Sequence, residues 1–240
     1  VNNNPLNSVV LVRSYSDNSE VVSKYGVEYI KGLQETGLIA TAKHFPGHGD
    51  TDADSHYFLP VVNHSIDRIH KVELVPFIAA IKNGVDAIMS AHVFFTAYEK
   101  DKIPATLSKN VLTNLLRNDL GFQGLIVSDC MEMRAISDHF TTPQGALMGL
   151  LAGLDMVFVS QTLENQVKTL ELIYNAVIDG TFSEELLNEK VSRILKYKEK
   201  VEKVMNEYFY NVSFEEKEKI ITNKESKELV SKIVDFSLTK

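Results

Sequence analysis

The stretch from Lys43 to His56, KHFPGHGDTDADSH, concentrates side chains that can transfer protons or bind ligands. Within fourteen residues it holds the histidines His44, His48 and His56 and the aspartates Asp50, Asp52 and Asp54. Gly47 and Gly49 interrupt regular structure there, and the apolar run Leu38–Ala42 leads directly into it. A hydrophobic strand that opens into a polar, glycine-containing loop is a common way for α/β enzymes to present catalytic groups. We therefore interpret this stretch as an active-site loop.

A second candidate is Asp129, which closes the apolar run in GLIVSDCMEM. A carboxylate at the end of a buried strand is costly to desolvate, so it usually serves chemistry, a ligand or a paired cation. The alternative is a helix N-cap for residues 131–136, because aspartate is a preferred cap. In the loop, Asp54 and His56 can form a pair in which the carboxylate orients the imidazole and favours its protonated form. Such an imidazole can give and take a proton near neutral pH.

Composition restricts the class of protein. Of 240 residues, 44% are hydrophobic and 24% charged, as in an ordinary soluble globular protein. The formal net charge of −7 argues against nucleic acid or anionic lipid as the main partner. No apolar run approaches the roughly 20 residues that a transmembrane helix needs. The single cysteine, Cys130, excludes an internal disulfide framework. The chain begins with Val1 rather than Met, and we expect it to be part of a longer protein.

Short apolar runs alternate with amphipathic segments along the chain. The runs predict strands at Val9–Val12, Leu38–Ala42, Val85–Ser90, Gly124–Ser128 and Leu154–Val159. The amphipathic segments predict helices at Glu20–Glu35, Ile66–Asn83, Lys109–Leu120, Pro143–Ala152, Leu163–Asp179, from Ser183 onward, and in Phe214–Lys240. This order predicts an α/β fold with a parallel sheet, either open and doubly wound or closed into a barrel. No glycine-rich phosphate-binding motif follows a strand, which disfavours a nucleotide-binding sheet. The last residues, VDFSLTK, read as the start of another strand.

Several strings, in their order along the chain, resemble the family 3 glycoside hydrolases, and within them the β-N-acetylglucosaminidase branch. They are KHFPGHG followed by DSH, SAH at Ser90–His92, PATLS at Pro104–Ser108, and SDCMEM at Ser128–Met133. The resemblance implies a (β/α)8 TIM-type barrel that here lacks roughly its first three strands. Residues 1–205 would then be the C-terminal part of the catalytic barrel. Residues 206–240 would be a helical linker toward a missing second domain.

The resemblance also implies a two-step hydrolysis that retains the anomeric configuration. Asp129 matches the nucleophile, and His56, paired with Asp54, matches the general acid/base. The residues that match the family's sugar-binding positions are Arg13, Lys43 and His44. The implied substrate is a GlcNAc-containing oligosaccharide or muropeptide, with no cofactor or metal required. The location of the protein stays open between the bacterial cytoplasm and an exported or cell-surface site.

Three other interpretations remain. A glycoside phosphorylase would resolve the same covalent intermediate with phosphate, which a histidine acid/base would repel less than a carboxylate would. A metal-dependent barrel hydrolase would use His44, His48 and nearby aspartates as ligands. A non-catalytic carbohydrate-binding fragment is the third, but it leaves Asp54, His56 and Asp129 without a role.

Overall fold

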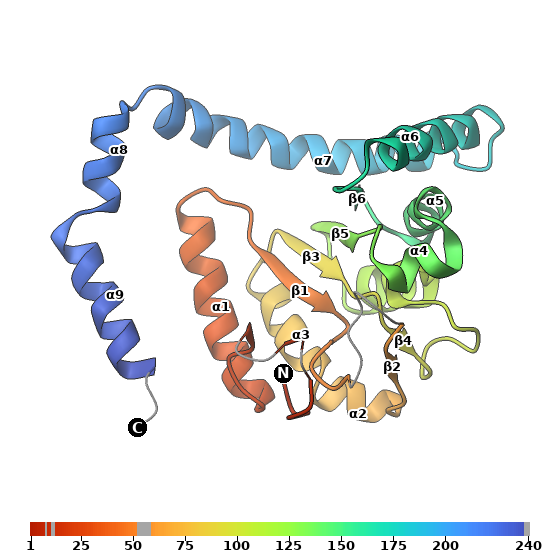
Figure 1. Ribbon diagram of the computed structural model, residues 1–240, viewed down its shortest axis with the longest axis horizontal. Coiled ribbons are helices and arrows are strands. Elements are labelled where there is room, and N and C mark those ends of the chain that lie inside the picture. Colours follow the sequence, from red (N-terminus) through yellow and green to blue (C-terminus); the bar gives the residue numbers. More distant parts are fainter. Residues whose placement is uncertain (8, 11–12, 52–58, 238–240) are drawn as a thin grey trace. The chain divides into compact units, whose positions relative to one another are not determined.

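The computed structural model describes residues 1–7, 9–10, 13–51 and 59–237 (Figure 1). Its centre is a four-stranded parallel sheet in the order β1-β3-β5-β6. These strands are β1 (Thr41–Phe45), β3 (Ala87–Ser90), β5 (Leu125–Cys130) and β6 (Met156–Phe158). A separate parallel pair joins β2 (Val61–Val62) to β4 (Phe94–Phe95). The chain therefore has an α/β fold built on a parallel sheet, as the sequence predicts.

Helices precede, connect and follow the strands of the main sheet. They are α1 (Ser19–Glu35), α2 (Ile66–Lys71), α3 (Leu74–Lys82), α4 (Arg134–Phe140), α5 (Thr142–Ala152), α6 (Leu163–Ile178) and α7 (Glu184–Val204). A 3-10 helix, η2 (Ala105–Leu107), and two π-helices, η3 (Asn110–Asp119) and η4 (Met205–Tyr210), add to these, followed by α8 (Phe214–Ile221) and α9 (Lys224–Ser237). Contacts divide the chain into two compact units, Val1–Tyr197 and Lys198–Lys240.

The core of the first unit forms where apolar strands meet amphipathic helices. Ile88 and Ile126 from the central strands are fully buried, and η3 adds Leu112 and Leu116. Helix α1 packs against α3, and both contact β1. The side chain of Asn18 caps α1 by accepting the N–H groups of residues 20 and 21. This packing fixes the carboxyl ends of the strands at one edge of the sheet.

A buried ion cluster holds the amino-terminal side of β6. The carboxylate of Asp155 is fully shielded from solvent and accepts the backbone N–H of Ile126 at 2.8 Å and Arg117 at 3.0 Å. Arg193 of α7 also binds this carboxylate. Lys190 of α7 donates to the carbonyl of Leu154 at 2.7 Å. The cluster thereby joins η3, β5, β6 and α7.

The structure corrects the position of the strand that enters the candidate loop. The prediction of Leu38–Ala42 is wrong by three residues, because β1 runs from Thr41 to Phe45. Its register is set by the ladder with β3, in which Thr41 pairs with Ala87 and Phe45 with Ser90. Pairing with a neighbouring strand thus extends β1 through two polar residues. Lys43 and His44 therefore lie in the strand rather than in the loop that follows it.

Two further predicted elements differ. Val9 and Val10 lie in a turn rather than a strand, because the side-chain oxygen of Asn7 accepts both of their backbone N–H groups; residues 11 and 12 lie outside the described residues. The predicted helix Ile66–Asn83 is divided into α2 and α3. The break falls at Val72, with φ −130°, beside the buried Glu73 that binds Arg68 of α2.

The second unit is helical. A capping box between Ser213 and Glu216 starts α8. The prediction that VDFSLTK begins a strand is wrong for its first four residues, which continue α9 to Ser237; the last three lie outside the described residues. Helical spacing of Leu229, Val230 and Ile233 favours continuation of the helix. Among the described helices, none has both the length and the apolar character needed to cross a bilayer.

Replacing Asp155 should strongly destabilise the fold. Asp155→Ala leaves Arg117 without its carboxylate and leaves Arg193 with Glu189 alone, which costs up to about 3–5 kcal/mol in the free energy of unfolding. The matched control is Asp138→Ala, which removes an exposed i,i+4 ion pair with Arg134 and costs about 0.2–1 kcal/mol. Chemical unfolding followed by far-UV circular dichroism measures both. Equal losses in the two variants would contradict a structural role for the cluster.

Candidate functional site

The carboxylate of Asp129 lies at the carboxyl end of β5 and is held through both oxygens. Its Oδ1 accepts the backbone N–H of Cys130 at 2.7 Å, and its Oδ2 lies 3.3 Å from His44 Nε2. Burial opposes ionisation of this side chain. The hydrogen bond with His44, the N–H of Cys130 and the charge on His44 outweigh that effect, so the pKa of Asp129 is well below its usual value. The carboxylate is ionised near neutral pH.

Local irregularities in the sheet bring His44 and Asp129 together. On β1, Lys43 pairs with Met89 but Phe45 pairs with the next residue of β3, so His44 is an extra residue. On β5, Val127 and Cys130 are three residues apart, whereas their partners on β6 are two apart. Such bulges re-aim side chains and are frequent beside active sites.

The bulge on β5 has its own hydrogen bonds. Ser128 is fully buried, and its hydroxyl oxygen accepts the N–H of Phe158 at 2.9 Å. The carbonyl of Phe158 accepts the N–H of Met131 at 2.8 Å. Side-chain and backbone bonds therefore hold both sides of Asp129 against β6.

The loop after Asp129 is also fixed. The carboxylate of Glu132 accepts the backbone N–H groups of Gln161 and Thr162, at 2.6 and 3.0 Å, and the amide of Asn165 at 3.0 Å. It thereby ties this loop to the segment that leads into α6 and to the side chain of Asn165 in its first turn. The sequence does not predict this role of Glu132, because it depends on contacts between residues some 30 positions apart.

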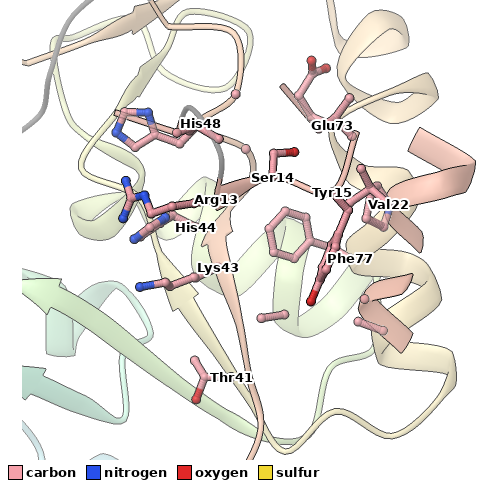
Figure 2. Close-up of a pocket in the computed structure, with 18 of the residues that line it drawn as sticks. Arg13, Ser14, Tyr15, Val22, Thr41, Lys43, His44, His48, Glu73 and Phe77 are labelled. Carbon is pink, nitrogen blue, oxygen red and sulfur yellow. The ribbon is translucent and has the colours of Figure 1, made fainter. Parts of the chain in front are cut away.

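Beside β1 lies a cavity of about 290 Å³ lined by β1, α1, α3 and the N-terminal segment. Figure 2 shows Arg13, Lys43 and His44 with their nitrogen atoms pointing the same way, while Tyr15 and Phe77 line another side. Lys43 is exposed rather than buried, and it forms no hydrogen bond or ion pair with the described residues. Arg13 is exposed and donates to the carbonyl of Val9, at 3.0 Å from Nε. These cations can donate to hydroxyl or amide oxygens of a ligand.

The described part of the candidate loop is tightly bonded. His48 is buried, with Nδ1 2.9 Å from the hydroxyl of Thr51, and its carbonyl accepts the amide of Asn7 at 2.7 Å. The ring of His48 also packs edge-on to that of His44. His48 therefore shapes the loop beside the site. Asp54 and His56, the predicted acid/base pair, lie outside the described residues.

Asp50 of this loop belongs to a cluster with His64, Arg68 and Glu73, three residues for which the sequence predicts no role. His64 Nε2 lies 2.5 Å from Asp50 Oδ2, and Arg68 binds both oxygens of Glu73 at 2.7 Å. Potential ligand atoms of Asp50, His64 and Glu73 lie within 4.8 Å of one another, the one such group found in the part of the chain that the structure describes. Of the ligands predicted for a metal-dependent hydrolase, His44, His48 and nearby aspartates, this group contains Asp50 but neither of those histidines. Arg68 already supplies positive charge to these carboxylates.

Comparisons with known proteins identify the family. The family model described as "Glycosyl hydrolase family 3 N terminal domain" matches residues 1–197, and the chain belongs to this family. The chain is 36% identical, over 218 residues, to "Beta-hexosaminidase A" from Pseudoalteromonas piscicida, covering 84% of this chain. It spans only 36% of that relative's length.

Solved structures agree with the family assignment. A glycoside hydrolase family 3 β-N-acetylglucosaminidase from Paenibacillus sp. str. FPU-7 superimposes with a TM-score of 0.91 and 44% identity, over 97% of this chain and 44% of that one. A "Beta-glucoside phosphorylase BglX" gives a TM-score of 0.88 at 26% identity, over 98% of this chain and 43% of that one.

Removing His44 should raise the pKa of Asp129. His44→Phe keeps a ring but deletes the hydrogen bond and the charge that favour the carboxylate, so Asp129 should take up a proton at higher pH. Because the folded pKa is depressed, ionised Asp129 stabilises the fold above the unfolded carboxyl pKa, and this stabilisation is lost as pH falls through the folded value. Carbon-13 NMR titration of labelled aspartates measures the shift. His64→Phe, which removes the partner of Asp50, should leave Asp129 unchanged; an unshifted Asp129 in His44→Phe would contradict the coupling.

Proposed function

We propose that the protein carrying this chain is a retaining exo-β-N-acetylglucosaminidase. It removes terminal GlcNAc from β-linked oligosaccharides such as the peptidoglycan fragments GlcNAc–anhydroMurNAc or GlcNAc–MurNAc. The observation that carries the proposal is the ionised carboxylate of Asp129, held at the end of β5 beside His44. The names of the relatives support the choice of sugar.

In the proposed reaction Asp129 attacks the anomeric carbon and the bond to the leaving oxygen breaks. His56, oriented by Asp54, gives its proton to that oxygen. Water then attacks the covalent glycosyl–enzyme, His56 accepts a proton from it, and Asp129 leaves as a carboxylate. Two inversions at one carbon give net retention. The reaction starts from an ionised Asp129 and a protonated His56. The low pKa of Asp129 therefore suits the role of nucleophile.

Arg13, Lys43 and His44 are the proposed sugar-binding residues. Lys43 offers an exposed ammonium group without a protein partner among the described residues, and His44 Nε2 lies 3.3 Å from Asp129 Oδ2. Donors of this kind suit hydroxyl groups and an acetamido oxygen.

The proposed parent domain is a (β/α)8 barrel. The four parallel strands of the main sheet would be four of its eight strands. Residues 206–240 would then lead, as a helical linker, toward a second domain.

Two substitutions in the intact protein test the roles. Asp129→Ala should lower turnover by at least about 10⁴-fold on every substrate, because no covalent intermediate can form. His56→Ala should lose about 10²–10⁴-fold on natural oligosaccharides. It should lose far less on a p-nitrophenyl glycoside, whose leaving group scarcely needs a proton. Equal losses of His56→Ala on both substrates would remove His56 from the acid role.

Product analysis separates the proposed hydrolase from its rivals. Free GlcNAc should form at the same rate with or without inorganic phosphate, and EDTA should not change that rate. Formation of GlcNAc 1-phosphate would favour the phosphorylase alternative. The solved β-glucoside phosphorylase is the structural comparison relevant to that alternative. Inactivation by EDTA, with recovery on adding a divalent ion, would favour the metal-dependent hydrolase.

A further inference from the structure

His92 is almost completely buried, with 1% of its surface exposed. It follows β3 by two residues. Both ring nitrogens have partners: Nδ1 lies 2.8 Å from the hydroxyl oxygen of Thr106, and Nε2 lies 3.0 Å from the carbonyl oxygen of Cys130. His92 therefore contacts the residue immediately after the proposed nucleophile.

The partners determine which nitrogen of His92 carries the proton. A carbonyl oxygen can only accept, so Nε2 donates to Cys130, and Nδ1 of the neutral ring is left as an acceptor beside the hydroxyl of Thr106. The oxygen of that hydroxyl also lies 3.0 Å from the carbonyl oxygen of Ala91. The hydroxyl of Ser90 donates in turn to Thr106 Oγ1 at 2.9 Å. Burial, as the largest effect, lowers the pKa of His92 to about 4, so the ring is neutral near pH 7. It adds no charge to the pair formed by His44 and Asp129.

The position of Cys130 matters because its own N–H binds Oδ1 of Asp129. The ladder between β3 and β5 ends at Met89 and Val127. Toward β6, the flanking residues Ser128 and Met131 bond to Phe158. On the side of β3, beyond the end of this ladder, the hydrogen bond from His92 Nε2 holds the carbonyl of Cys130.

We propose that His92 is a positioning residue for Asp129, acting through the carbonyl oxygen of Cys130. By fixing Cys130 from the β3 side, His92 keeps the N–H of that residue on Oδ1 and the other oxygen beside His44. His92 neither touches the sugar nor transfers a proton. This inference rests on the proposed function, in which Asp129 is the nucleophile.

The test is the kinetics of His92→Phe in the intact protein, with a chromogenic β-GlcNAc substrate. The variant keeps a ring of similar size but loses the donor to Cys130. Misplacement of a reacting group by about 1 Å can cost about 100-fold in rate, so we expect a fall in kcat of about that size with KM changed less than about twofold. The rate of inactivation by a fluorinated GlcNAc analogue, which reports the attack by Asp129 alone, should fall by the same factor.

Two variants serve as rescue and control. His92→Gln places an amide N–H near the position of Nε2 and should recover at least about tenfold of the lost kcat, roughly the value of one hydrogen bond. Thr113→Val removes another side-chain donor to a backbone carbonyl, that of Ala152, away from Cys130. It should unfold at slightly lower denaturant concentration but keep the kcat of the unmodified protein. If His92→Phe does not fold, Thr106→Val tests the same series of hydrogen bonds, because Thr106 is the partner of His92 Nδ1. We then expect a fall in kcat at unchanged KM.

The outcomes distinguish a failure of the positioning role of His92 from a failure of the proposed function. Loss of kcat at constant KM in His92→Phe, with recovery in His92→Gln, supports the positioning role. A kcat for the folded His92→Phe or Thr106→Val variant within twofold of the unmodified protein overturns it while leaving the proposed function intact. A kcat loss in Thr113→Val equal to that in His92→Phe also overturns it, because general destabilisation would then explain both. Absence of β-GlcNAc turnover in the unmodified protein overturns the proposed function and this inference together.

Discussion

A charged carboxylate at the end of a buried strand is the constraint around which this structure is organised. Taking Asp129 partly out of water disfavours its ionised form, and only compensating bonds can reverse that effect. The backbone N–H of Cys130 and the ring of His44 supply them, and together they hold the pKa of Asp129 below its usual value. A regular ladder through Val127–Cys130 would not provide this arrangement, since one residue here has no counterpart on β6.

Polar groups in the surrounding elements hold Asp129 and its two hydrogen-bonding partners in place. Ser128 takes a hydrogen bond that a regular strand would give to a backbone carbonyl, and Glu132 ties the following loop to the start of α6. Below the site, Asp155 joins β6 to η3 and α7 through buried ion pairs. Ser128 and Asp155 are buried polar groups, for which a satisfied hydrogen bond is strong and a broken one is costly. The proposed chemistry thus rests on polar bonds that are spread over most of the first unit.

Much of this could be predicted from sequence, and the exceptions have physical causes. Alternating apolar and amphipathic segments indicated the parallel sheet, and the run before Asp129 placed that residue at a strand end. The limits of β1 were missed because interstrand pairing, not hydrophobicity, carries it through Lys43 and His44. The contact of His44 with Asp129 joins residues 85 positions apart, and the bond between Asp50 and His64 was missed for a similar reason. Periodicity reports local structure and cannot register such pairs.

Fastening both oxygens of Asp129 has a stereochemical consequence. With Oδ1 on a backbone amide and Oδ2 beside an imidazole, the carboxylate plane cannot rotate freely about its χ2 torsion. In the proposed reaction its lone pairs would then offer one fixed trajectory to an incoming pyranose, so that selectivity between anomers would be a property of the backbone at the strand end. A glycoside of the opposite configuration would present its aglycone toward the nucleophile and leave no collinear path for displacement.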